Sequence, residues 1–184
     1  MERYDDSRLS EFRQLRQGIR QSKEHMVVGI DIAKDRHRAF FGTPTGRTLL
    51  RKVVFENTKE GFEKLLFHTD QLMRRHALKK VVFGMEPTAD YHKPLGEYLT
   101  GMDHMVVLVA GGAVRRNREL LDGRWDKNDT KDAANIADLV CQREPEGRSG
   151  NQRDVPKKPR YRISPNSLLL ISCGYMDLNF HQKK

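Results

Sequence analysis

Three short apolar runs rich in β-branched residues divide the chain, and stretches long enough for a helix lie between them. The runs are MVVGIDIA at residues 26–33, KKVVFGMEPT at residues 79–88 and HMVVLVA at residues 104–110. Continuous apolar runs of this length are typical of strands buried on both faces of a sheet. Parallel strands need crossover connections, which are usually helices. The spacing therefore predicts an α/β domain.

The first apolar run is followed closely by two further strand-like segments. HRAFFGTP at residues 37–44 leads through the turn TPTGR into LLRKVVFEN at residues 49–57. Because little chain separates them, we expect these three strands to form an antiparallel meander.

Helical periodicity appears directly after the meander. Residues 58–78 place apolar side chains on one helical stripe, with Thr58 as the expected N-cap. A second helix is expected at residues 90–102, with Pro94 in its early turns, and a third after the last strand. The predicted fold class is a mixed α/β sheet, with three antiparallel strands followed by parallel strands and flanking helices.

Charge and composition divide the chain into three parts. We expect an amphipathic helical arm at residues 1–25, the α/β domain at residues 26–142 and a basic, disordered tail at residues 143–184. The formal net charge is +9, and counting Lys and Arg against Asp and Glu leaves +5 of it in residues 143–184. Such an excess favours a polyanionic partner, since Lys and Arg release counterions from phosphates on binding.

The cysteine content and the hydropathy of the chain predict its cellular location. The two cysteines, Cys141 and Cys173, have no metal-ligand spacing and are expected to be reduced thiols. The sequence shows no signal peptide and no apolar stretch long enough to span a membrane. We therefore expect a cytoplasmic location and no membrane partner.

Four carboxylates stand in positions that suit one site. Asp31 and Glu86 each follow a strand that is predicted to be buried, so both fall at the carboxyl edge of the sheet, where α/β proteins bind ligands. Asp129 and Asp132 lie one helical turn apart at the start of the last helix. These two residues also suit a helix cap. Four converging carboxylates need positive charge, and two Mg2+ ions would supply it in a site for phosphodiester cleavage.

Three sequence blocks carry a resemblance to a known family. VGIDIAKDRH, GMEPTADYHKPL and GRWDKNDTKDAANIADLV resemble, in order, the three motif blocks of the DEDD transposases of the insertion sequence 110 group. The resemblance covers about residues 26–142. It implies a RuvC-like, RNase H-like catalytic domain that cleaves and exchanges DNA strands.

The resemblance also assigns residues and partners. It implies that Asp31, Glu86, Asp129 and Asp132 bind the metal ions, and that a structured guide RNA accompanies the DNA. Basic residues around the last block fit contacts with phosphates, although a solvated basic face would use the same residue types. They are Arg115, Arg116, Arg118, Arg124, Lys127 and Lys131.

One departure from the family keeps alternatives open. Family members continue into a second domain that carries a nucleophilic serine, and residues 143–184 do not resemble that domain. We therefore expect a truncated transposase, which associates with itself or with the full-length enzyme. The alternatives are a stand-alone RuvC-type junction-resolving endonuclease and a catalytically inactive nucleic-acid-binding fragment. An actin-like ATPase is disfavoured because Ile32 and Ala33 replace the glycine and hydroxyl residue that would hold phosphate.

Overall fold

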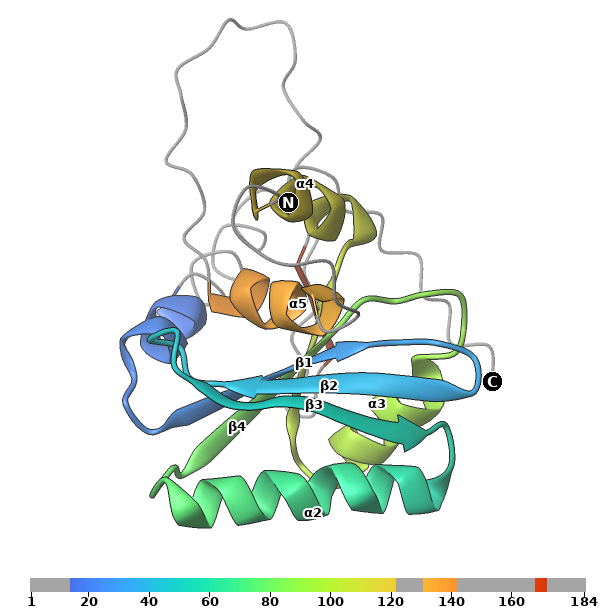
Figure 1. Cartoon of the computed structure of the whole chain (residues 1–184), viewed down its shortest axis with the longest axis horizontal. Coiled ribbons are helices and arrows are strands. Elements are labelled where there is room, and N and C mark those ends of the chain that lie inside the picture. Colours follow the sequence, from blue (N-terminus) through green and yellow to red (C-terminus); the bar gives the residue numbers. More distant parts are fainter. Residues whose placement is uncertain (1–13, 122–130, 142–167, 172–184) are drawn as a thin grey trace, which may run out of the picture.

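A single six-stranded sheet forms the centre of the protein (Figure 1). The computed structural model describes residues 14–121, 131–141 and 168–171 of the chain. The strands lie in the order β3-β2-β1-β4-β5-β6. They are β1 (His25–Asp31), β2 (Arg36–Gly42), β3 (Thr48–Glu56), β4 (Lys80–Met85), β5 (Met105–Val109) and β6 (Leu168–Ile171).

The strand directions confirm the predicted mixed sheet. β1, β2 and β3 pair in antiparallel fashion, as the closely spaced segments indicated. β4 lies parallel to β1, and β5 lies parallel to β4. The crossover from β3 to β4 passes through α2 (Lys59–Arg75), and the crossover from β4 to β5 passes through α3 (Lys93–Gly101).

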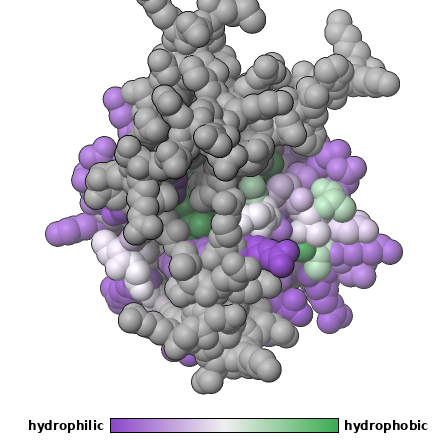
Figure 2. Space-filling model, turned by 90° about the horizontal axis from the view of Figure 1, so that it is seen from above, coloured by the Kyte–Doolittle hydropathy of each residue, from purple (hydrophilic) through white to green (hydrophobic). Residues whose placement is uncertain are grey.

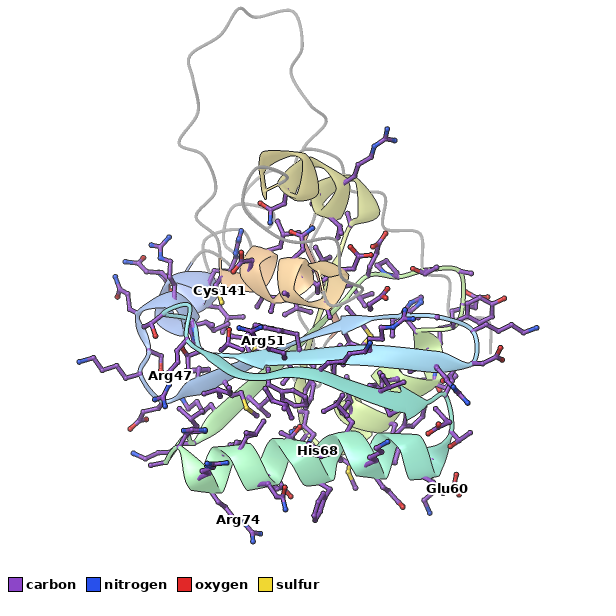
Figure 3. All side chains as sticks on the ribbon, viewed as in Figure 1. Arg47, Arg51, Glu60, His68, Arg74 and Cys141 are labelled. Atoms are coloured by element: carbon purple, nitrogen blue, oxygen red, sulfur yellow. The ribbon has the colours of Figure 1, made fainter. Side chains whose placement is uncertain are left out.

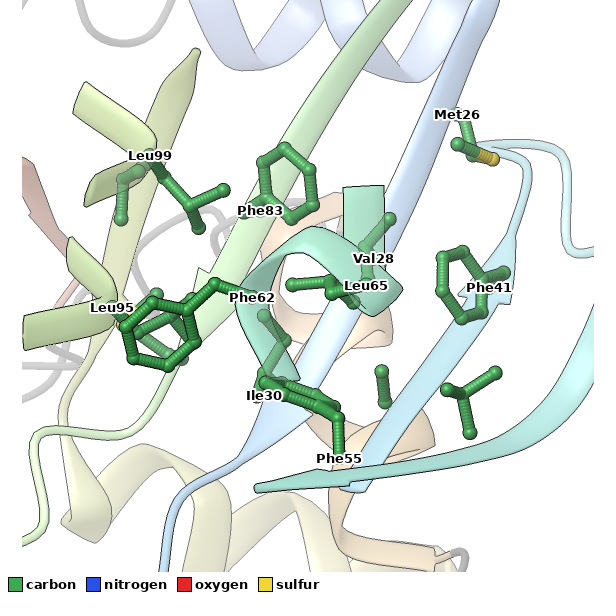
Figure 4. Close-up of a cluster of buried hydrophobic side chains, with 14 of the residues drawn as sticks. Met26, Val28, Ile30, Phe41, Phe55, Phe62, Leu65, Phe83, Leu95 and Leu99 are labelled. Atoms are coloured by element: carbon green, nitrogen blue, oxygen red, sulfur yellow. The ribbon is translucent and has the colours of Figure 1, made fainter. Parts of the chain in front are cut away.

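The strong amphipathic helix forms where the sequence predicted it. The hydroxyl oxygen of Thr58 accepts a hydrogen bond from the N–H of Gly61 at 3.3 Å, so Thr58 is the N-cap of α2. Phe62 and Leu65 point from α2 into a core beneath the sheet (Figure 4). Ile30, Phe55 and Phe83 meet them from three different strands. Burial of this apolar stripe holds α2 on the sheet.

Two more helices cover the opposite face of the sheet. They are α4 (Gly111–Leu121) and α5 (Lys131–Cys141), and Figure 1 shows α5 directly on the sheet with α4 beyond it. Val27 and Val82 pack against Ile136 of α5 in a second core. A buried pair of amide side chains, Asn117 and Asn135, joins α4 to α5 by a hydrogen bond. The chain therefore has a helix, sheet, helix layering in which each sheet face has its own core.

The structure corrects two details of the sequence analysis. Residues 168–171 were expected to belong to a disordered tail, but they form β6 and pair in parallel with β5. The segment LLLI forms a strand because its apolar residues suit a position beside β5 at the edge of the sheet. One helix was expected after β5, and the structure has two, α4 and α5.

The amino-terminal arm is described from residue 14. Residues 14–21 are helical, and Ile19 is buried in the core under α5. The Arg16 guanidinium donates a hydrogen bond to the backbone oxygen of Leu139 at 3.0 Å. These contacts dock this helix on the domain. Across the described part of the chain, no helix is long and apolar enough to cross a membrane.

Candidate metal and nucleic-acid site

Asp31 and Glu86 end neighbouring parallel strands at the same level. The register of β1 and β4 pairs Gly29 with Gly84 and Ile30 with Met85, so the next residues on each strand are Asp31 and Glu86. Side chains alternate between the two faces of a strand, and Ile30 and Met85 are buried in the core with α2. Asp31 and Glu86 therefore fall on the opposite face, which carries α5.

The paired glycines bring α5 unusually close to the sheet. A Cβ atom at Gly29 would lie 1.9 Å from the backbone oxygen of Ala133 and 2.6 Å from the backbone nitrogen of Ala137. A Cβ atom at Gly84 would lie 2.6 Å from Val140 Cγ2. The helix can settle at this depth because both sheet positions lack a side chain.

α5 runs across the sheet so that its first turn lies toward Asp31 and Glu86. Its carboxyl-terminal part lies near the start of β1, because Leu139 receives the hydrogen bond from Arg16, which precedes that strand. Ala133, near the other end, lies over Gly29, two residues before Asp31. Asp132 adjoins Ala133 in the first turn of α5 and is only partly buried. The fold thus directs Asp132 to the same edge of the sheet as Asp31 and Glu86.

The start of α4 meets the Glu86 carboxylate. A Cβ atom at Gly111, the first residue of α4, would lie 2.5 Å from Glu86 Oε1. The absence of a side chain at Gly111 leaves room for the carboxylate. The amino terminus of a helix carries partial positive charge, which favours an anionic side chain there.

Arg38 is a member of the site that the sequence analysis missed. It pairs with Asp31 across β1 and β2, and its Nη1 lies 3.6 Å from Asp31 Oδ2. The Asp31 side chain is 26% exposed and the Arg38 side chain 38%, so solvent and ions reach both. Only the register of the β1–β2 hairpin, which is connected through residues 32–35, could have revealed this pairing from the sequence.

The loop after Glu86 holds a strained backbone and a buried histidine. Ala89 has a φ of 46°, in the left-handed region that favours glycine. His92 ends the loop and is buried, and this burial lowers the pKa of His92 below its ordinary value. Strained residues of this kind often mark functional sites.

The donor set fits a hard divalent cation. Asp31, Glu86 and Asp132 offer carboxylate oxygens, which are the ligands that Mg2+ prefers, and all three are partly exposed. Among the described residues, however, no three His, Cys, Asp or Glu side chains are close enough to hold a metal ion together. Asp129 lies outside the described residues. The four-acid metal site accordingly stays a prediction.

The predicted basic residues are only partly described. Arg115 is exposed on α4, while Arg116, Arg118 and Lys131 occupy helical positions in α4 and α5. Arg124 and Lys127 lie outside the described residues.

Two further basic residues on β3, Arg51 and Lys52, are exposed, and no acidic side chain within the described ranges pairs with either. Figure 3 draws Arg51 on the α5 side of β3. Figure 2 looks onto that side of the molecule, where the described residues at the rim are mostly hydrophilic. These residues could not be singled out from the sequence, because the strand pattern alone does not say which part of the meander adjoins the site.

The fold and the placement of the acids define the class of protein. The sheet is mixed: a three-stranded antiparallel meander continues into parallel strands, and acids stand at the carboxyl ends of β1 and β4. This arrangement is the RuvC-like form of the RNase H-like fold. The chain belongs to the DEDD transposase family of the insertion sequence 110 group. The profile of that family, described as a transposase, matches residues 28–154. The match extends beyond the expected domain boundary at residue 142.

Solved structures give two further similarities. RuvC of T. thermophilus, in complex with a Holliday junction substrate, is 13% identical with a TM-score of 0.40, and the match covers 61% of this chain and 90% of that chain. An exopolyphosphatase from Cytophaga hutchinsonii is 10% identical with a TM-score of 0.32, and the match covers 50% of this chain and 36% of that chain. None of the curated proteins matches the chain.

Proposed function

We propose that the protein cleaves and exchanges DNA strands during transposition of an insertion sequence, with Mg2+ held by Asp31, Glu86, Asp129 and Asp132. One observation carries the proposal. Asp31 and Glu86 follow paired positions of adjacent parallel strands, on the face where the first turn of α5 brings Asp132. A transposase family that carries a RuvC-like domain needs acids in such an arrangement to bring metal ions to a phosphodiester.

Different residues have different roles in the proposed site. Asp31 and Glu86 directly follow paired positions of neighbouring strands, so the sheet brings their backbones side by side. Gly111 leaves the space that the Glu86 carboxylate occupies at the start of α4. When bound, Mg2+ would polarise the phosphate oxygens and activate the attacking group.

The Arg38 guanidinium offers a positive charge beside Asp31. In the metal-free protein it offsets part of the repulsion among the carboxylates. A phosphate oxygen of the substrate would compete for the same guanidinium, which presents several N–H donors in a planar fork.

The proposed partners are polyanions. DNA is the substrate, and we include a structured guide RNA and a second copy of the protein or a full-length transposase as partners. Exposed Arg51 on β3 and exposed Arg115 on α4 add positive charge on the side of the sheet that bears the acids. Contacts of Lys and Arg with phosphates make the affinity fall steeply with salt concentration.

The test is Mg2+-dependent nicking of supercoiled DNA by the purified chain. Asp31→Asn and Glu86→Gln should abolish nicking, because each removes a negative charge and a ligand while keeping the size of the side chain. Asp70→Asn on α2 and Glu97→Gln on α3 are matched controls, since these exposed carboxylates lie on helices of the opposite face. Both controls should nick as the wild type does.

Binding measurements separate the possible outcomes. Isothermal titration should show Mg2+ binding that is lost in Asp31→Asn and Glu86→Gln but kept in the controls. Equal binding by all five proteins would contradict the acid assignment. Strict preference for four-way junctions over linear and supercoiled DNA would favour the junction-resolving alternative. Tight DNA binding without Mg2+ binding or nicking would favour the inactive fragment.

A further inference from the structure

The Asn57 side chain lies between the two loops that follow the proposed metal-binding acids. Asn57 is the connecting residue between β3 and Thr58, the N-cap of α2. Its backbone N–H donates to the backbone oxygen of Asp35 at 3.0 Å, and its Nδ2 donates to the backbone oxygen of Lys34 at 3.2 Å. Both acceptors belong to the loop that leads from Asp31 into β2.

The same amide group also reaches the second loop. Asn57 Nδ2 donates to the backbone oxygen of Tyr91 at 3.4 Å. Tyr91 belongs to the loop that leads from Glu86 into α3. One side-chain nitrogen therefore bridges backbone groups of two loops that are more than 50 residues apart in the sequence.

A buried histidine also holds the loop that follows Asp31. His37 is completely buried, and its Nδ1 accepts a hydrogen bond from the N–H of Ala33 at 3.3 Å, in the loop after Asp31. Its ring packs against Phe55 and Phe62. Burial lowers the pKa of His37, and the adjacent Asn57 side chain partly opposes that shift. His37 and Asn57 thus hold the first loop at three consecutive residues, 33, 34 and 35.

Strand pairing alone cannot fix the loops. The register of β1 and β4 ends at Ile30 and Met85, so Asp31 and Glu86 lie beyond this ladder, although Asp31 still pairs with Arg38 of β2. Beyond that point the loop after Glu86 adopts the left-handed conformation at Ala89, which unrestrained chain would avoid. Contacts outside the sheet are needed to hold this arrangement.

We propose that Asn57 is a positioning residue that couples the Asp31 loop to the Glu86 loop and so sets the geometry in which the acids bind Mg2+. Asn57 acts through the two loops and touches neither the metal nor the substrate. Residues that orient metal ligands in this indirect way typically alter metal affinity about 10-fold to 100-fold when they are removed. The inference rests on the proposed function for its catalytic consequence but not for the coupling itself.

The coupling is tested without metal by hydrogen–deuterium exchange of the full chain. In Asn57→Ala the amides of residues 32–35 and 88–92 should both exchange faster than in the wild type, because both loops lose the shared donor. Asn57→Asp keeps the size of the side chain but replaces the donor by an acceptor, so it should loosen the same two loops. Thr58→Ala is the matched control, since it removes the N-cap of α2 and leaves the bridge intact.

The functional consequence is tested by titrating Mg2+ in the nicking assay. Both Asn57 variants should need about 10-fold more Mg2+ for half-maximal nicking, and saturating Mg2+ should restore most of the rate. Thr58→Ala should lower the melting temperature yet keep the wild-type Mg2+ midpoint. A purely structural role for Asn57 would instead lower the melting temperature without moving that midpoint.

Two results would overturn the inference while the proposed function stands. One is unchanged exchange in both loops of the Asn57 variants, and the other is a wild-type Mg2+ midpoint in those variants. Absence of Mg2+ binding and nicking in the wild type would reject the proposed function and the effect on metal affinity together. Exchange that rises in both loops would still establish the coupling in that case.

Discussion

Replacing Gly29 by alanine would place a methyl group in the space now filled by the backbone of α5. The added Cβ would lie 1.9 Å from the backbone oxygen of Ala133, whereas such contacts are not shorter than 3.0 Å. The helix must therefore move from the sheet by at least about 1.1 Å, the difference between these distances. Because the clash is with backbone, no rotation of a side chain relieves it, and we expect a destabilisation of about 3 kcal/mol, the upper end for overpacking.

The displacement should also move Asp132 relative to Asp31, since Asp132 adjoins Ala133 in α5. A misplacement of about 1 Å in an active site can reduce the rate about 100-fold. Urea denaturation followed by circular dichroism measures the change in unfolding free energy, and the nicking assay measures the change in rate.

Two other glycines supply matched comparisons. A Cβ atom at Gly84 would meet the methyl groups of Val140 and Ile136, at 2.6 and 3.2 Å, and these side chains can adjust. Gly84→Ala should therefore cost about 1 kcal/mol. A Cβ atom at Gly101 would meet no atom within 4 Å, so Gly101→Ala should change stability by about 0.5 kcal/mol or less. If Gly29→Ala were as stable as Gly101→Ala, the close seating of α5 on β1 would be refuted.

The remaining predictions concern backbone strain and pH. Ala89→Gly should raise the unfolding free energy by about 1 kcal/mol, because glycine adopts the φ of 46° without steric cost, and urea denaturation checks this. Burial lowers the pKa of His37 below the ordinary value of 6.5, so the unfolded chain binds more protons as the pH falls. Stability should be full above about pH 7.5 and decline below about pH 6.5. A His37→Phe variant should show a shallower decline, and an identical pH profile would contradict the role of this histidine.

Much of the fold follows from local sequence signals. The spacing of the first three strand-like segments predicted the antiparallel meander, and the apolar stripe with its Thr58 cap predicted α2. The two acids at strand ends could be placed at one edge because parallel strands share their carboxyl ends. β6 could not be predicted in this way, since Leu168–Ile171 pairs with a strand about 60 residues earlier and lies amid a polar, proline-containing segment.

The sequence by itself determined which chemical groups are available and on which element each one lies. The position of Asp31 and Glu86 directly after two continuous apolar runs placed both acids at the ends of neighbouring strands, and the blocks around them indicated the family. Only the tertiary structure decided how these groups meet, because register, helix depth and loop restraint depend on residues far apart in the chain. The Gly29 and Gly84 pair seats α5, and Arg38 joins Asp31 through the hairpin register. The bridge from Asn57 to both loops likewise exists only once β3, β1 and β4 lie in one sheet.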